Sequence, residues 1–185
     1  MAVSASQAPQ NQFHTGIEGL PEVALIHITN YLAPEDITRL ALTCKRLYSV
    51  LPRFVVMIGK DFRIHGPLGG HWAPKPYFSG PPLPARVKQL TMSVEWKDQG
   101  WGNRKGQVFI SLVRGRTKKI VAERREPMGI APHDWATVTV ELAEDNVVTE
   151  ARQGDFYQFA RNAGGGGGHK LEVKNFKAIA HLCKE

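Results

Sequence analysis

The sequence has few cysteines and no long apolar run. Its 185 residues include only Cys44 and Cys183, too few for a disulfide framework or a cysteine-based metal site. Such low cysteine usage is typical of a reducing, intracellular compartment, in the cytoplasm or nucleus. No apolar stretch is long enough to cross a bilayer, so we expect no membrane association. Residues 1–15 lack the basic start and apolar centre of a secretory signal, and their small polar side chains predict a disordered tail.

Familiar catalytic motifs are also absent from the sequence. It contains neither a Gly-x-Ser-x-Gly elbow nor a His-Glu-x-x-His pair. Cys44 lies within an apolar helical pattern, where a thiol is a poor nucleophile. His133, Asp134 and His169 offer acid–base chemistry, but their positions along the chain define no shared geometry. We therefore expect a non-catalytic protein that needs no metal and no other cofactor.

The most unusual local feature is a run of five glycines, residues 164–168, shortly before Lys170. A phosphate-binding loop needs Ser or Thr after the lysine and a helix that begins there. Leu171 follows instead, and the next residues mostly alternate between apolar and charged, which predicts a strand. We interpret the run as a mobile hairpin loop, and we expect alanine at residues 165–167 to leave folding nearly intact.

The net charge of +7 and the pI of about 9.6 are compatible with a nucleic acid, an acidic partner or an anionic membrane surface. The bases are densest in "RGRTKKIVAERR", residues 114–125. They would not all share one face of a strand pair, because neighbouring side chains on a strand point to opposite faces. We expect a solvated, charged edge here and not a nucleic-acid interface.

Residues 16–52 show helical periodicity. Apolar residues from Val23 to Ile28 predict a first helix that ends near Leu32. Pro34 occupies a position that helices tolerate in their first turn, and Pro52 is placed to close the second helix. The sequence thus predicts two consecutive helices in this block.

The remainder divides into a connecting region and a β domain. Residues 53–65 fit either a helix or a strand, and residues 66–84 are rich in Gly and Pro, so we expect residues 53–85 to be a connecting helix or linker. Residues 86–185 contain at least six β-branched and aromatic segments separated by turn residues. Their spacing predicts an antiparallel β-sandwich of the jelly-roll kind. The cleanest alternation is "WATVTVEL", which places Ala136, Val138, Val140 and Leu142 on one face.

The helical block carries a more specific pattern: a Leu-Pro start, then apolar residues at fixed intervals, then Pro-x-Asp-Ile and a Lys-Arg pair. The matching positions are Leu20, Pro21, Ile28, Leu32, Pro34, Asp36, Ile37, Leu40, Leu42, Cys44, Lys45 and Arg46. This block resembles the F-box family, in register from Leu20 to Leu47. It departs from the family pattern at Val23, Thr29 and Leu47, where the family often has acidic, apolar and aromatic residues.

The resemblance implies that this block docks on the Skp adaptor of a Skp-cullin-F-box ubiquitin ligase, and through it on a cullin. The residues expected to bind the Skp adaptor are Leu20, Pro21, Ile26, Ile28, Leu32, Pro34, Ile37, Leu40 and Leu42. A short helical block cannot bury so many apolar side chains internally, which is consistent with a surface covered by a partner. The alternative is an ordinary helical hairpin that docks on the protein's own β domain.

In F-box proteins the following domain usually captures the substrate. The segment "WKDQGWGNRKGQ", residues 96–107, holds two tryptophans, and aromatic faces stack on sugars or flat cations. We expect Trp96 to pack into the end of the core, since it ends an alternating strand. For Trp101 the sequence favours neither a core role nor a ligand-binding role. The candidate ligand-loop residues are Trp101, Asn103, Gly166 and His169. The architecture weakly resembles a galactose-binding-like β-sandwich, so the target could be a glycosylated protein, and the alternative function is a lectin-like protein without a ligase role.

Overall fold

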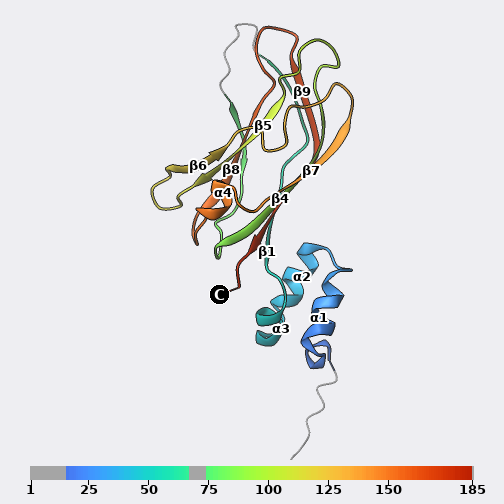
Figure 1. The fold of residues 1–185 in the computed structure, drawn as a ribbon, viewed down its shortest axis with the longest axis vertical. Coiled ribbons are helices and arrows are strands. Elements are labelled where there is room, and N and C mark those ends of the chain that lie inside the picture. The colour runs from blue at the N-terminus through green and yellow to red at the C-terminus, as the bar shows by residue number, and fades with distance from the viewer. Residues whose placement is uncertain (1–15, 67–73, 185) are drawn as a thin grey trace, which may run out of the picture. The chain divides into compact units, whose positions relative to one another are not determined.

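The computed structural model describes residues 16–66 and 74–184, so the predicted tail at residues 1–15 and part of the Gly/Pro-rich segment lie outside the described chain. The chain separates into two compact units, Met1–Pro52 and Arg53–Glu185. The first is helical and the second is built of strands (Figure 1). The fold class is α+β, as the sequence predicts.

Residues 16–52, the described part of the first unit, contain three α-helices and not two. The elements are η1 (Ile17–Gly19), α1 (Glu22–Thr29), α2 (Pro34–Ala41) and α3 (Lys45–Val50). The single helix expected between Pro34 and Pro52 is interrupted because Cys44 has an extended backbone, with φ −156° and ψ 159°. The Cys44 Sγ accepts a hydrogen bond from the Leu47 N–H at 3.5 Å and so caps α3. Cys44 is therefore the N-cap of α3, whereas the sequence pattern predicted that it lies inside a helix.

Helical spacing accounts for the interior of the first unit. Ile37 and Ala41 lie four residues apart on α2, and both are buried. Leu25 of α1 and Leu47 of α3 are also buried, and α3 packs against both other helices. The Arg46 guanidinium donates a hydrogen bond to the Leu20 carbonyl oxygen at 2.6 Å, which joins the start of the block to α3.

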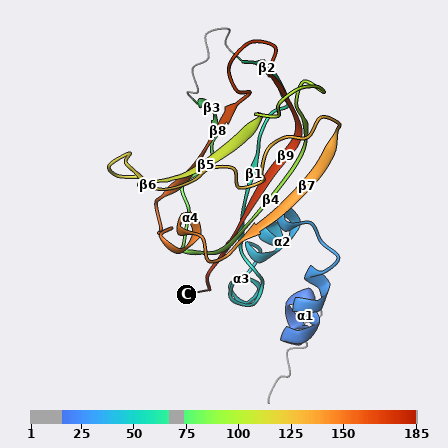
Figure 2. The same ribbon diagram turned by 45° about the horizontal axis from the view of Figure 1, so that its top comes forward.

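The second unit is an antiparallel β-sandwich. Its elements are β1 (Phe54–Ile58), β2 (Phe62–His65), β3 (Lys75–Ser79), β4 (Val87–Lys97), β5 (Gln107–Val113), β6 (Ile120–Arg124), β7 (Ala136–Leu142), α4 (Asn146–Thr149), β8 (Phe156–Asn162) and β9 (Lys170–Leu182). One sheet has the order β1-β9-β4-β7, with β2 also paired to β9, and the other has the order β3-β8-β5-β6. The two sheets face each other in both views (Figures 1 and 2).

Side chains that alternate along the strands fill the space between the two sheets. On β4 the side chains of Leu90, Met92, Val94 and Trp96 are all buried in the core. The alternation predicted for β7 is confirmed, because Ala136, Val138, Val140 and Leu142 are the less exposed residues of that strand. Aromatic rings complete the centre of the core, where Phe78 stacks on Phe159 with 4.7 Å between ring centroids.

Strand β9 changes phase in its middle. Leu171 and Val173 are buried before the change, and Phe176 and every second residue after it are buried beyond it. The change occurs at Asn175, which has φ +52°, where the register between β4 and β9 shifts. Asn tolerates this left-handed conformation better than most residues. The resulting bulge lets both halves of a long strand face the same core.

Two expectations are wrong in the second unit. Residues 53–85 are not only a connector, because β1, β2 and β3 lie there and have their backbones paired with β9 and β8. The glycine run does not close a hairpin either. It joins β8 in one sheet to β9 in the other, so it crosses between the sheets.

We predict that His181 makes the second unit lose stability as the pH falls. Burial, and then the nearby Lys88 charge, lower the pKa of His181 from its usual 6.5, against a smaller opposite effect of Glu141. The unfolded chain therefore takes up the proton first, and folding stability falls as the pH drops through about 6.5. The variant His181→Gln should show a shallower loss of unfolding free energy between about pH 7.5 and 5.5.

The measurement is denaturant unfolding followed by tryptophan fluorescence. All four tryptophans lie after Pro52, so the signal reports the second unit. Equal pH slopes for the wild type and His181→Gln would contradict the prediction.

Candidate functional site

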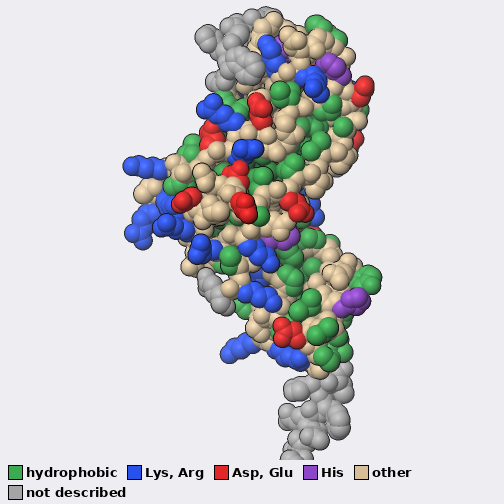
Figure 3. Space-filling view, viewed as in Figure 1, with side chains coloured by type: hydrophobic (Ala, Val, Ile, Leu, Met, Phe, Trp, Pro, Cys, Tyr) green, Lys and Arg blue, Asp and Glu red, His purple; other side chains and the backbone are tan. Residues whose placement is uncertain are grey.

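The first unit exposes large apolar side chains. The residues are Ile17, Val23, Ile26, Tyr31, Leu42 and Tyr48. Val23, Tyr31 and Leu42 are the clearest cases, since 79%, 77% and 71% of their surfaces are accessible. Hydrophobic side chains gather over α1 and α2 in the space-filling view (Figure 3). Exposed apolar clusters of this kind mark protein-binding surfaces. We call Val23, Ile26, Tyr31, Leu42 and Tyr48 the apolar helical surface.

The residues expected to bind an adaptor differ widely in exposure. Pro21, Ile26 and Leu42 are exposed, whereas Ile37 is only 4% exposed and belongs to the interior. The others are half-buried: Leu20, Ile28, Leu32, Pro34 and Leu40. A side chain in the interior shapes the surface but cannot itself contact a partner. The structure thus narrows the candidate contacts of this set to its exposed and half-buried members.

Sequence reasoning missed three exposed residues of the apolar helical surface: Val23, Tyr31 and Tyr48. Val23 precedes Ile26 by three residues on α1, so helical spacing alone places both on one side. Tyr31 lies against His27, with 5.4 Å between ring centroids. Tyr48 and Leu42 line one shallow hollow beside Cys44. The exposure of Leu42 and Tyr48 depends on where α2 ends, which the apolar pattern did not reveal.

In the second unit, two loops meet at one end of the sandwich. The Gln99 side-chain amide holds them together, because its nitrogen donates to the carbonyl oxygens of Trp101 at 2.7 Å and Asn103 at 2.9 Å. Its oxygen accepts from the Lys170 N–H at 3.3 Å. The Lys105 ammonium donates to the Gly165 carbonyl oxygen at 3.3 Å. We call residues 98–106 and 163–169 together the loop edge.

Trp101 is the most exposed aromatic residue of the loop edge, with 65% of its surface accessible. Its ring lies against Gly168, where an added Cβ would be 3.2 Å from the ring. Asn103 and Gly166 are exposed and His169 is half-buried, so all four candidate ligand-loop residues lie at the loop edge. Trp96 is buried in the core, which confirms its expected structural role.

The buried carboxylate of Asp98 forms hydrogen bonds that hold the loop edge in place. Asp98 Oδ1 accepts a hydrogen bond from the Gly100 N–H at 2.9 Å and lies 2.9 Å from His133 Nδ1. Asp98 Oδ2 and His169 Nδ1 are buried without a hydrogen-bond partner among the described residues. The pairing of Asp98 with His133 was missed because 35 positions separate the two residues and no local pattern connects them.

The glycine run has a defined backbone. Gly164, Gly166, Gly167 and Gly168 have φ values of +86°, +104°, +79° and +75°, in the region that favours glycine. The positive φ values of Gly166 and Gly167 argue against the expectation that residues 165–167 tolerate alanine, whereas Gly165 does not have a positive φ. The run also leads into strand β9 and not into a helix, so it lacks the geometry of a phosphate loop.

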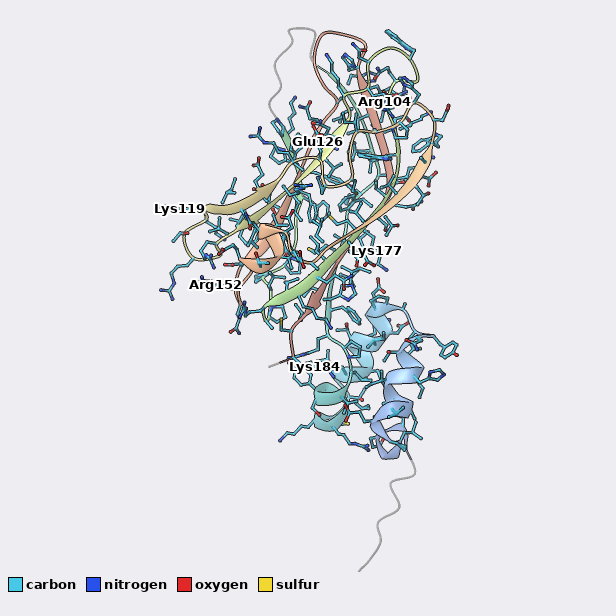
Figure 4. All side chains as sticks on the ribbon, viewed as in Figure 1. Arg104, Lys119, Glu126, Arg152, Lys177 and Lys184 are labelled. Atoms are coloured by element: carbon cyan, nitrogen blue, oxygen red, sulfur yellow. The ribbon has the colours of Figure 1, made fainter. Side chains whose placement is uncertain are left out.

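The basic segment at residues 114–125 forms β6 and the turn before it. Arg114 pairs with the buried Asp155 carboxylate at 2.9 Å and serves the fold. Arg116, Lys118 and Lys119 are exposed, and Lys119 lies at the outer end of the turn (Figure 4). Lys and Arg side chains also gather on this side in Figure 3. This arrangement matches the charged, solvated edge expected from the sequence.

Comparison with known proteins agrees with the helical geometry. Residues 17–54 match the F-box-like family model, so this part of the chain is an F-box-like domain. No curated protein matches the sequence. Among the described residues, no helix has the length and apolar character needed to cross a membrane.

Solved structures match this chain only at low similarity. The VP2 subviral particle protein of infectious bursal disease virus has 14% identity and a TM-score of 0.45, covering 72% of this chain and 33% of that one. The EclA C-terminal domain, a sugar-binding protein, has 11% identity and a TM-score of 0.34, covering 65% and 77%. The Stig cyclase Fisc from Fischerella sp. TAU has 12% identity and a TM-score of 0.38, covering 72% and 77%. This chain thus spans about a third of the viral protein.

We predict that alanine at Gly164 destabilises the second unit more than alanine at Gly166. Both positions have positive φ, which costs a non-glycine residue about 1 kcal/mol or more. A Cβ at Gly164 would also collide with the Lys105 side chain, whereas at Gly166 nothing lies within 4 Å. Gly164→Ala should therefore lose about 1–3 kcal/mol more than Gly166→Ala.

Urea unfolding followed by tryptophan fluorescence measures this difference. Gly166→Ala serves as the matched control, because it carries the backbone strain without the collision. If both variants unfold at the same urea concentration as the wild type, the glycine run is not a packed turn.

Proposed function

We propose that this protein is a substrate-recognition adaptor of a Skp-cullin-F-box ubiquitin ligase. The observation that carries the proposal is the F-box-like domain at residues 17–54 with large apolar side chains left in solvent. In the proposal, residues 16–52 bind the Skp adaptor, and the adaptor connects the chain to a cullin. Its cellular location would then be the cytoplasm, the nucleus or both.

The proposed mechanism is proximity. The protein would hold a target close to a ubiquitin-charged enzyme, which raises the local concentration of the reacting groups. No bond is made or broken by this chain, and it requires no cofactor. The apolar helical surface supports the docking step, since burial of exposed apolar area is the main source of binding free energy at such interfaces.

The β-sandwich, residues 53–185, would capture the target through the loop edge. Trp101 offers an open aromatic face, and the exposed Asn103 of the same loop carries a side-chain amide that can bond to hydroxyl groups. An aromatic face beside hydroxyl-binding polar groups suits a sugar. We therefore propose a glycosylated protein as the target. A lectin-like protein without a ligase role is the second candidate, and the same exposed tryptophan favours it.

We predict that Leu42→Glu strongly weakens binding to the Skp adaptor. Leu42 is exposed at the end of α2, so the change should leave the fold intact while placing a charge in the proposed interface. Loss of a central apolar contact should weaken binding by about 30-fold or more. Co-purification and titration with the purified Skp adaptor measure the effect.

The matched control is Ile120→Glu, which alters a residue of the second unit that is 56% exposed. It should bind the adaptor like the wild type. Circular dichroism verifies that both variants are folded. Failure of the wild type itself to bind would refute the adaptor role and leave the lectin-like reading.

We also predict that Trp101→Ala lowers glycan binding about tenfold and leaves adaptor binding unchanged. The substitution removes the open ring of the loop edge but no core packing. A glycan array with the full chain measures binding, and Tyr31→Ala is the control for loss of an exposed aromatic residue elsewhere. Equal glycan binding by Trp101→Ala and the wild type would remove the loop edge from consideration as a sugar site.

A further inference from the structure

A second hollow opens between β2 and β3, apart from the apolar helical surface and the loop edge. Its volume is about 700 Å³, within the range of small-ligand sites. Phe62 of β2 and Tyr77 of β3 form its aromatic wall, with 4.7 Å between ring centroids. Both strands lie at the same end of the sandwich (Figure 2).

Arg161 is the central polar residue of this hollow. Its guanidinium carbon lies 4.3 Å from the centroid of the Phe62 ring and 5.5 Å from that of Tyr77. No carboxylate among residues 16–66 and 74–184 forms an ion pair with it. Its Nε is buried without a hydrogen-bond partner in the same part of the chain. A partly buried cation is costly unless an anion compensates it, so Arg161 is prepared to receive one.

Among the described residues, no neighbouring carboxylate comes close enough to Arg161 to serve as that anion. Burial raises the pKa of Tyr77 to about 12, so the phenol stays neutral and donates a hydrogen bond to the Lys60 carbonyl oxygen at 2.6 Å. Asp61 lines the hollow, but its Oδ1 accepts from the Asn175 N–H at 3.0 Å. With Lys60 and Arg161, it leaves a net charge of +1. This charge suits one carboxylate better than a doubly charged phosphate.

The wall and the strand order define what should carry the carboxylate. The aromatic rings favour an apolar or aromatic group beside the anion, because their faces would otherwise remain exposed to water. Strand β3 is an edge strand of its sheet and pairs only with β8 among the described strands. An edge strand can pair with an extended peptide, which would bring the end of that peptide to the hollow.

We propose that the hollow between β2 and β3 binds a carboxylate attached to an apolar or aromatic group, presented by the carboxy terminus of a peptide. Arg161 forms a bidentate pair with the carboxylate, which the planar guanidinium is suited to do. Phe62 and Tyr77 contact the last side chain of the peptide. The nearby Lys60 strengthens the attraction from the rim.

The test compares two acetylated Gly-Gly-Phe tripeptides, one with a free carboxylate and one with a carboxamide, in calorimetric titrations of the full chain. The acid should bind about tenfold or more tightly than the amide, because a charge-assisted hydrogen-bond pair is lost in the amide. Because this comparison changes only the ligand, it does not depend on the folding of any variant. Equal affinities, or no binding by either peptide, would overturn the proposal.

The protein variants locate the effect. Arg161→Gln should reduce binding of the acid to the level of the amide, while Arg125→Gln, an exposed arginine paired with Glu123, should change nothing. Ser79→Trp blocks the hollow from an exposed position at its lining and should weaken the acid at least as much, even if Arg161→Gln fails to fold. Retained binding in folded Arg161→Gln or in Ser79→Trp would place the site elsewhere.

Phenylacetate distinguishes the source of the carboxylate. It has the same anion and aromatic group but no peptide backbone. Weaker binding than the tripeptide acid supports a peptide terminus. Binding as tight as that of the tripeptide would overturn the peptide assignment and leave a site for small aromatic acids.

Discussion

The structure of the second unit depends on strand β9. This one strand pairs with β1, β2 and β4, so the order of its sheet follows from it. A regular strand of that length twists, and a fixed alternation would not keep both of its halves in register with a curved core. The bulge at Asn175 solves this problem, and its backbone N–H and side chain bond to Asp61 and Glu95 on neighbouring elements. Strand β9 also bonds to both candidate sites, because the Lys170 N–H donates to Gln99 at the loop edge and the Asn175 N–H donates to Asp61 at the hollow.

The helical unit obeys a different constraint, which is its size. A few short helices cannot enclose all the apolar side chains that they carry, so some must remain at the surface. The unit resolves this by burying one or two residues of each α-helix, such as Leu25, Ile37 and Leu47, and leaving Val23 and Leu42 outside. Exposed apolar area on a small domain lowers its solubility unless a partner covers it. This is the part of the chain that matches the F-box-like family model.

Local pattern predicted the elements that local chemistry determines. The helices after Pro21 and Pro34, the inward face of β7 and the burial of Trp96 all follow from spacing within one segment. Most errors arose where distant pairing decides the outcome, whereas the break at Cys44 is a local feature that the apolar pattern did not reveal. Residues 53–85 look like a linker because their strands are short and interrupted by Gly and Pro, and only β9 and β8 make them strands. The Asp98–His133 pair and the crossing path of the glycine run were hidden for the same reason.

Two arginines show how the same residue type serves structure and recognition. Arg114 lies 2.9 Å from the buried Asp155 carboxylate, which also accepts a hydrogen bond from the Arg152 N–H. The charge of Arg114 is therefore compensated within the fold. Arg161 rests on aromatic rings and meets no carboxylate in the described chain. The rings stabilise a guanidinium only in part, since a cation–π contact is weaker than a desolvated ion pair. Such a position stabilises the folded protein little by itself, and its charge is effective chiefly when an external anion arrives.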